Sequence, residues 1–409
     1  MGRGISRRTL LVGAGLGALA AGGLGLAYWR DGRRLSFVSN LGGGGDHVDD
    51  FRNMDRIFPT RTFRRGANVS PLAAGSAIDL PATFASAGRD LDTTKFLDET
   101  DTTGLLVLAD GKVALERYWR GNGPDTRWIS WSVGKSFISA LVGIAVEEKA
   151  IASLDDPLTR YAPEFAGTGY DGVTVRHALT MSSGVRWNED YSDPQSDVHR
   201  FGRAMAMGES MNDFARTLVR AHAPGTVMHY NSMDAQTLGL VLLRATGMNP
   251  SAYLEDRIWS RIGVENDGYW LLDGAGNEFA AGGVNVTLRD YARFGQLYLN
   301  EGAHEGKSVI PAAWVRASHD PDAPHLKPPA RTAEDPGLGY GYLWWVPKDV
   351  DGPYMAIGIF NQFVYVDPRR RIVIAKTSAS RNYMSGNSDR VWREGETLDF
   401  FTALAEAAA

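Results

Sequence analysis

The sequence predicts an α+β fold in which one antiparallel sheet is built from both ends of the chain and a helical insert packs beside it. Three observations lead to this prediction. β-rich runs flank a turn near residue 110, short β-rich runs recur after residue 343, and helical patterns fill the stretch between them. Strands at both ends, separated by helices, are accommodated most economically by one shared sheet with the helices packed against it.

The first 35 residues have the pattern of an export signal. Ser6-Arg7-Arg8-Thr9-Leu10-Leu11 is a twin-arginine pattern, and an apolar run rich in Gly and Ala follows from Leu10 to Ala27. We expect a cleaved signal that directs the protein to the periplasm. An uncleaved membrane tether is one alternative, and it would be the only membrane contact. A cytosolic protein with an apolar start is the other.

Residues 36–90 are expected to form a linker and an N-terminal arm, because they show mixed polarity and little periodicity. Gly42-Gly43-Gly44-Gly45 reads as flexible linker. Four apolar residues are expected to pin the arm onto the body: Phe51, Met54, Phe58 and Phe63. The rest of the chain, 91–409, is predicted to be the main domain, with a helical lobe at about residues 150–285. The 409 residues allow one large domain or two closely packed lobes with a sizeable core.

The first elements of the domain are a hairpin and a buried helix. Residues 104–118 contain two β-rich runs around Asp110-Gly111, a dipeptide that tolerates the positive φ angles of a two-residue turn. The stretch from Ser130 to Val146 is apolar nearly all round, which is typical of a buried helix.

Further helices are expected over residues 175–182, 210–220 and 232–247, the last bounded by Gly247 and followed by Asn249-Pro250. The C-terminal part then turns to short strands separated by Pro- and Gly-containing turns, and it ends in a helix. The predicted strands are Leu343–Val346, Tyr354–Phe360, Phe363–Val366 and Ile372–Thr377, and the helix covers about 389–407.

Composition excludes several classes of function. The chain has no cysteine, so disulfides, thiolate metal sites and a cysteine nucleophile are all excluded. A net charge of −5 gives no electrostatic footprint for nucleic acid. The eight histidines form no H-E-x-x-H pattern or close pair. We therefore expect no metal, no cofactor and no nucleic-acid partner.

The chemistry is predicted to centre on Ser132 and Lys135. Their i, i+3 spacing places both side chains on one face of a helix. A serine hydroxyl needs a base to become a nucleophile, and burial lowers the pKa of a lysine so that its amine can serve. One S-x-x-K is expected by chance in a chain of about this length, so the alternative is a capping serine and a surface lysine. The apolar run around Lys135 disfavours that alternative.

The surroundings of this pair resemble the serine β-lactamase and penicillin-recognising superfamily. Trp131-Ser132-Val133-Gly134-Lys135-Ser136 resembles its first motif, and further similar stretches run to about residue 378. They are Asp155–Leu158, Tyr161–Glu164, Val175–Gly184, Ala281–Asn285 and Asp290–Gly295. Within the superfamily, the chain is most similar to class C β-lactamase-like esterases and, more narrowly, to 6-aminohexanoate-dimer hydrolases. The resemblance implies a three-layer α/β/α core with a mostly helical inserted lobe.

The resemblance also implies roles for residues outside the first motif. His229-Tyr230-Asn231-Ser232 matches the second motif, so Tyr230 is expected to reach the nucleophile as an acid or base. Whether Lys135 or Tyr230 is the base stays open. The third motif usually carries a cation, but Ala356-Ile357-Gly358 stands in its place. By resemblance, the backbone N–H groups of Ser132 and Ile359 form the oxyanion hole, and Gly358 lets substrate lie close to the strand.

Substrate contacts are predicted from the same resemblance. A tyrosine and an aspartate of the helical lobe hold the substrate in the dimer hydrolases, and Tyr191 is the best positional match. Asp193 and Asp197 are two candidates for the aspartate, with solvated loop acids as the alternative. Asn285 is expected either to contact substrate or to stabilise its own turn.

These observations predict a serine hydrolase that cleaves a small linear amide or ester through an acyl-enzyme on Ser132. One alternative is a D-alanyl-D-alanine peptidase or β-lactamase, which the missing cation at Ala356 disfavours. Another is a non-catalytic sensor of cell-wall peptides, which the intact set of Ser132, Lys135 and Tyr230 disfavours. The preference between amide and ester, the natural substrate and the oligomeric state stay open.

Overall fold

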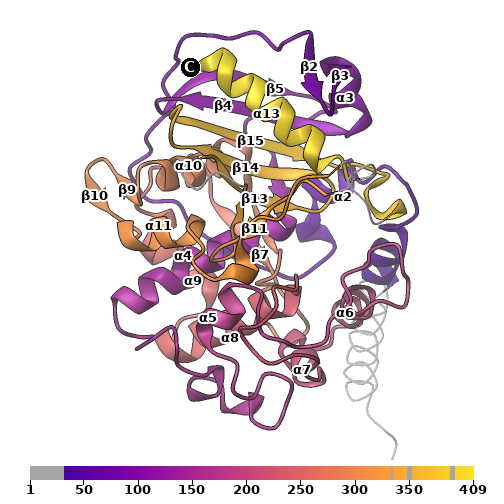
Figure 1. Ribbon diagram of the computed structural model, residues 1–409, viewed down its shortest axis with the longest axis vertical. Coiled ribbons are helices and arrows are strands. Elements are labelled where there is room, and N and C mark those ends of the chain that lie inside the picture. The colour runs from indigo at the N-terminus through magenta and orange to yellow at the C-terminus, as the bar shows by residue number, and fades with distance from the viewer. Residues whose placement is uncertain (1–31, 333–334, 348–351, 387–391) are drawn as a thin grey trace, which may run out of the picture.

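The computed structural model describes all residues except 1–31, 333–334, 348–351 and 387–391 (Figure 1). Its main element is a seven-stranded sheet in which every pairing is antiparallel. In spatial order the strands are β11 (Gly339–Tyr340), β12 (Trp345–Val346), β13 (Tyr354–Gly358), β14 (Gln362–Asp367), β15 (Ile372–Ser378), β4 (Thr102–Ala109) and β5 (Lys112–Tyr118).

The sheet joins the two ends of the chain, as predicted. Strand β15 pairs with β4 along the whole of β4, and β4 turns into β5 at Asp110 and Gly111. Both turn residues have positive φ, 48° and 75°, which is the conformation that the Asp-Gly dipeptide predicts.

The two faces of the sheet are covered by different helices. Leu105 and Val107 of β4 face α13 (Glu394–Ala408) and α3 (Thr93–Glu99), whereas the alternate residues Leu106 and Leu108 belong to the larger core on the other face. That core includes α4 (Gly134–Glu147) and α10 (Leu288–Leu299). The result is the expected three-layer α/β/α arrangement, with α13 lying across the outer face (Figure 1).

The helical lobe lies beside the sheet (Figure 1). Its helices are α5 (Val175–Leu179), α6 (Asp197–Ala206), α7 (Met211–Arg216), α8 (Ser232–Thr246) and α9 (Pro250–Leu254), and α11 (Ala312–His319) follows α10. Helix α8 ends at Gly247 with φ 71°, as the sequence predicts. The helices α6, α9, α10 and α11 were not predicted as elements.

A second, four-stranded sheet was missed altogether. It has the order β1 (Thr60–Phe63), β7 (Gly268–Leu271), β8 (Val284–Thr287) and β6 (Arg127–Ile129), and it connects the N-terminal arm to the helical lobe. The arm is thus more ordered than its weak periodicity suggested. It also contains α2 (Val48–Arg52), a 3₁₀ turn at Met54–Arg56 and the hairpin of β2 (Thr83–Ser86) and β3 (Arg89–Asp92).

The predicted pinning of the arm is confirmed, since Phe51, Met54, Phe58 and Phe63 are all buried. The predicted strand Leu343–Val346 is too long, because Leu343 adopts φ 58° and the strand begins at Trp345. The twin-arginine pattern lies outside the described residues. Within the described residues, no helix is long and apolar enough to cross a membrane.

Candidate active site

Ser132 lies in a tight turn between strand β6 and helix α4. The turn is a 3₁₀ element, Trp131–Val133, and α4 proper begins only at Gly134, so Ser132 precedes the helix on which the sequence placed it. Trp131 adopts φ 44°, an unfavourable conformation for a bulky residue. Its ring is held between Phe51 and Phe360, at centroid distances of 5.4 and 5.5 Å. Packing from two distant segments therefore holds the turn that presents Ser132.

Lys135 lies one turn further along and is 1% exposed. Its Nζ donates to Ser132 Oγ over 2.7 Å and to the carbonyl oxygen of Ala281 over 2.8 Å. Burial lowers the pKa of Lys135 from 10.5 to about 8, while the nearby charge of Glu189 opposes that shift. The amine is therefore partly neutral near physiological pH, and it can accept the Ser132 proton across the same short distance.

Tyr230 joins this pair from the loop that precedes α8. Its ring lies 5.1 Å from Lys135 Nζ and stacks on Trp345 at 5.4 Å. Burial raises the pKa of the Tyr230 phenol well above 10, Glu189 raises it further, and the interaction with the Ser132 hydroxyl opposes both. The structure thus brings a hydroxyl, an amine and a protonated phenol together from three separate stretches of the chain.

The end of strand β13 lies directly against the Ser132 turn. A Cβ on Gly358 would lie 2.6 Å from the carbonyl oxygen of Ser130 and 3.1 Å from the backbone N of Ser132. Only a glycine allows this approach. Ile359 follows and lines the same cavity as Ser132. The backbone N of Ser132 thus lies against the residue that precedes Ile359, which is compatible with the predicted oxyanion hole.

Two residues in the left-handed conformation connect β13 to β14, Phe360 with φ 61° and Asn361 with φ 72°. Asn361 is held by its side chain: its Nδ2 donates to the backbone of Trp392, and its Oδ1 accepts from Lys376 Nζ over 2.7 Å. Gln362 donates to the carbonyls of Ile359 and Phe360. We call residues 359–362 the oxyanion turn, because they contain Ile359, the predicted oxyanion donor. The hydrogen bonds of Asn361 and Gln362 hold this turn.

Of the predicted substrate contacts, only Tyr191 lines this cavity. Its phenol donates to Glu189 over 2.6 Å. Asp193 and Asp197 instead accept hydrogen bonds within their own loop and from Arg200. Asn285 is fully buried in β8 and donates to the carbonyl of Gly283. These three stay predictions, and the structure places none of them in the cavity wall.

Glu189 is the functional candidate that the sequence did not reveal. It accepts hydrogen bonds from Tyr191, from the Trp187 indole and from both the backbone and hydroxyl of Ser232. Its negative charge raises the pKa of both Lys135 and Tyr230, against the effect of burial on Lys135. Asn231 caps α8, and the Ser232 hydroxyl donates to Glu189. A Glu-x-Tyr spacing in a polar loop was the available signal.

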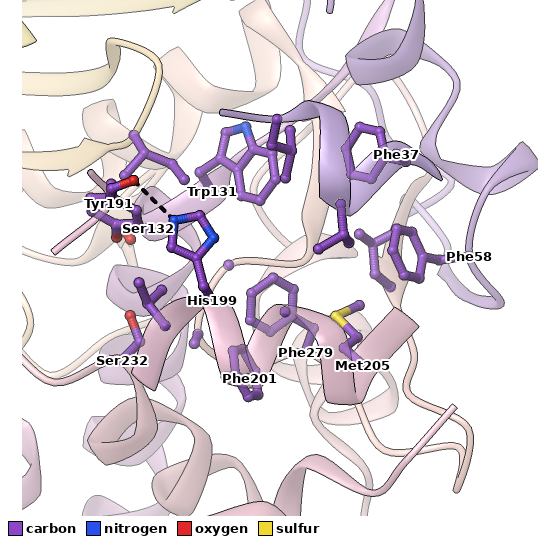
Figure 2. Close-up of a pocket in the computed structure, with 18 of the residues that line it drawn as sticks. Phe37, Phe58, Trp131, Ser132, Tyr191, His199, Phe201, Met205, Ser232 and Phe279 are labelled. Carbon is purple, nitrogen blue, oxygen red and sulfur yellow. Dashed lines mark hydrogen bonds between the residues drawn. The ribbon is translucent and has the colours of Figure 1, made fainter. Parts of the chain in front are cut away.

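The cavity at Ser132 has a volume of about 90 Å³ and is lined mostly by apolar side chains (Figure 2). Ser132 and Tyr191 lie at one end, whereas Phe37 and Phe58 lie at the other. Among the described residues, no group of three or more His, Asp or Glu side chains is placed to hold a metal ion.

Comparisons with known proteins show the family of the chain. The profile of the Beta-lactamase family matches residues 94–397. The 6-aminohexanoate-dimer hydrolase of Paenarthrobacter ureafaciens is 31% identical over 338 residues, which cover 80% of this chain and 84% of that protein. Esterase EstB of Burkholderia gladioli is 31% identical over 36% of this chain and 39% of its own length.

Solved structures show the same fold. A Bacillus anthracis protein that carries the provisional name 6-aminohexanoate-dimer hydrolase superposes with a TM-score of 0.77, at 21% identity over 87% of this chain and 93% of its own. EstCE1, a hydrolase with promiscuous acyltransferase activity, superposes with a TM-score of 0.59, at 16% identity over 77% of this chain and 96% of its own. The family profile spans most of the chain, and the curated relatives named above are hydrolases. The chain therefore belongs to the beta-lactamase family of hydrolases.

Proposed function

We propose that this protein is a serine hydrolase that opens a small linear amide or ester through an acyl-enzyme on Ser132. The observation that carries the proposal is the 2.7 Å contact between Ser132 Oγ and the buried amine of Lys135. A lysine whose pKa lies at about 8 is neutral often enough to take the serine proton. The nearby phenol of Tyr230 supplies a second proton carrier.

The proposed reaction has two halves. In the first, Ser132 Oγ attacks the carbonyl carbon, its proton passes to the Lys135–Tyr230 pair, and the backbone N–H groups of Ser132 and Ile359 bind the oxyanion. The bond between the carbonyl carbon and the leaving nitrogen or oxygen then breaks, and the phenol of Tyr230 gives that atom a proton. In the second half, water loses a proton to the same pair and attacks the acyl carbon. The bond from that carbon to Ser132 Oγ breaks, and the pair returns a proton to Oγ as the acid leaves.

Two features favour a linear substrate over an antibiotic. The third-motif position is Ala356, a buried residue without charge, so no cation stands there to hold the carboxylate of a β-lactam. The relatives named above include an enzyme called a dimer hydrolase and one called an esterase. Both names fit the cleavage of an open-chain amide or ester.

The test uses purified protein and a panel of p-nitrophenyl esters, linear ω-amino-acid oligomers and a chromogenic cephalosporin. We expect ester or oligomer turnover and a covalent acyl adduct by intact-protein mass spectrometry, both lost in Ser132→Ala. Full activity in Ser132→Ala would reject the mechanism. Cephalosporin cleavage alone would reject the substrate class, and no turnover by folded wild-type protein would favour the sensor alternative.

A further inference from the structure

The cavity behind Ser132 extends well away from the reactive groups. From Ser132, Lys135 and Tyr191 it runs past Trp131 toward Phe37 and Phe58 (Figure 2). Its walls come from separate parts of the chain, among them the N-terminal arm, the Ser132 turn, helix α6, strand β7 with the loop after it, and the oxyanion turn. They include Leu41, Met54, Phe201, Met205, Leu271 and Ile359.

The lining is chemically simple. Phe37, Phe58, Phe201 and Met205 are all buried, with 4–6% of their surface exposed. Besides Tyr191, the titratable side chains among the described residues of the wall are Lys135 and His199. The His199 ring Nε2 donates to the backbone oxygen of Tyr191 over 2.9 Å, so that atom already has a partner. No carboxylate among these lining residues faces the space, so an ammonium group entering it would find no counter-charge.

The position of Tyr230 indicates which half of the substrate enters. Tyr230 is not a lining residue of the cavity, although its ring lies 5.1 Å from Lys135 Nζ. The leaving group must meet the phenol of Tyr230 to receive its proton, so it lies on that side of Ser132. Ile359, whose N–H faces the acyl oxygen in the proposed mechanism, is a lining residue. The cavity is therefore on the acyl side.

We propose that this cavity is an acyl pocket for a short, uncharged apolar acyl group, and that residues 37–41 close its far end. The proposal rests on the serine-hydrolase function above and narrows its substrate class to esters or amides of short aliphatic acids. A dry apolar cavity of about 150 Å³ holds benzene. By that comparison, the 90 Å³ available here suits an acyl chain of about four to six carbons.

The first experiment measures kcat/KM for p-nitrophenyl acetate, butanoate, hexanoate and octanoate. Each added methylene that finds apolar surroundings raises kcat/KM about fourfold, so we expect a rise to butanoate or hexanoate and a fall at octanoate. The p-nitrophenyl ester of 6-aminohexanoate is expected to react at least about tenfold more slowly than hexanoate, because its ammonium loses solvation without gaining a partner. Equal or faster turnover of the amino ester would overturn the proposal.

Variants of helix α6 test the pocket itself. Gly202 faces the N-terminal segment, where a Cβ would lie 3.3 Å from Val38 Cγ1, so Gly202→Met adds a flexible side chain to the cavity. We expect it to lower kcat/KM for hexanoate about tenfold relative to acetate. Met205→Ala and Phe37→Ala enlarge the space and should move the optimum to a longer acyl chain. Met207→Ala, at a side chain 56% exposed just beyond the helix, is the control and should leave the profile unchanged.

The outcomes separate this proposal from the function on which it rests. If Ser132→Ala is inactive but the acyl profile of the wild type is flat, or does not change in Gly202→Met and Phe37→Ala, the pocket is rejected and the serine mechanism stands. If Ser132→Ala stays active, the mechanism itself fails. In a parallel series of butanoate esters with alcohols of increasing length, the pocket variants should leave the dependence of kcat/KM on alcohol length unchanged. A response there would place the cavity on the leaving-group side.

Discussion

At the scale of single residues, the reactive amine is defined by its surroundings. Lys135 is almost fully buried, and its two hydrogen bonds go to the Ser132 hydroxyl and to the carbonyl of Ala281. Neither partner is an anion that would hold the amine charged. Desolvation therefore dominates over the more distant charge of Glu189 and lowers the Lys135 pKa to about 8.

This pKa predicts the pH dependence of the reaction. In the proposed mechanism the neutral amine accepts the Ser132 proton, and the neutral fraction grows as the pH rises through the pKa. We therefore expect kcat/KM for p-nitrophenyl butanoate to increase about tenfold per pH unit below pH 8 and to level off above it. The measurement is a stopped-time ester assay across this range, corrected for spontaneous hydrolysis. A rate independent of pH between about 6 and 9 would contradict a titrating Lys135.

Gly358 supplies a second prediction at this scale. An alanine there would place its Cβ 2.6 Å from the Ser130 carbonyl oxygen, which forces β13 away from the Ser132 turn. Loss of one oxyanion donor lowers kcat by a factor of about 10² to 10³. We therefore expect Gly358→Ala to have a kcat at least about tenfold lower than the wild type, with an unchanged circular dichroism spectrum. Gly123→Ala, where no atom lies within 4 Å of the added Cβ, is the matched control. Wild-type kcat in Gly358→Ala would show that the close approach is not needed.

The sequence predicted the main residues that meet at this site. It did not predict the contacts that hold them in place. Ser132, Lys135 and Tyr230 carry motif-like neighbours, and the structure brings them together. Glu189 carries no motif, and its importance arises only because Tyr191 and Ser232 converge on it from separate segments. Asp193 was predicted from the family resemblance and stays a prediction, and its carboxylate accepts hydrogen bonds within its own loop. Contacts between distant segments are what a linear pattern cannot encode.

At the scale of elements, the oxyanion turn is hydrogen-bonded to a buried lysine of strand β15. Lys376 is 1% exposed, and its Nζ donates to Asn361 Oδ1 and, over 2.5 Å, to Ser378 Oγ. Asn361 also accepts from Thr397 Oγ1 of α13 at the longer distance of 3.3 Å. Since Phe360 and Asn361 both have positive φ, side-chain anchors have to offset the cost of that conformation.

We expect Lys376→Met to loosen this turn. It removes the donor to Asn361 and Ser378 and should lower the free energy of unfolding by about 1–3 kcal/mol. Because Ile359 then loses its fixed direction, kcat for the butanoate ester should fall about tenfold while KM changes little. Urea unfolding and steady-state kinetics measure the two effects. Lys112→Met, at an exposed lysine of β5, is the control. Reduced stability with unchanged kcat would limit Lys376 to a structural role.

The predicted elements differ in accuracy for a physical reason. The long runs of β4, β5, β14 and β15 and the helices α4 and α8 are bounded by strong turn or cap residues such as Asp110-Gly111 and Gly247, and all were predicted. The second sheet was not, since three of its strands are four residues long and one is three. Such strands are stabilised by their neighbours in the sheet rather than by their own pattern.

At the scale of the whole molecule, the site lies where three parts of the chain meet. The main sheet contributes the oxyanion turn between its inner strands β13 and β14, and the helical lobe contributes Tyr230 and Glu189. The N-terminal arm packs against the Ser132 turn and the oxyanion turn through Phe51. The arm was predicted to be pinned by apolar side chains, and that was correct. Its participation in the cavity wall through Phe37 and Leu41 was not predicted, because the intervening four glycines suggested a detached linker.

Phe51 is the arm residue whose ring contacts both turns of the site. It is fully buried, and its ring lies 5.4 Å from Trp131 in the Ser132 turn and 5.0 Å from Phe360 in the oxyanion turn. One side chain from the arm thus contacts both the Ser132 turn and the oxyanion turn, whose relative position the proposed mechanism depends on. Removing it should affect catalysis beyond the general loss of stability that follows from a core cavity.

A comparison of Phe51→Ala with Phe96→Ala tests this. Phe96 is 1% exposed and packs on Phe84 and Phe400 on the opposite face of the sheet. Both substitutions should lower the free energy of unfolding by about 3–5 kcal/mol, because each leaves a cavity of aromatic size. At a temperature where both variants are folded by circular dichroism, we expect kcat to fall about tenfold in Phe51→Ala only, since only that cavity lets the Trp131 and Phe360 turns move apart. Equal kcat in the two variants would show that the turns keep their register without the arm, and the arm would then act on the enzyme through stability alone.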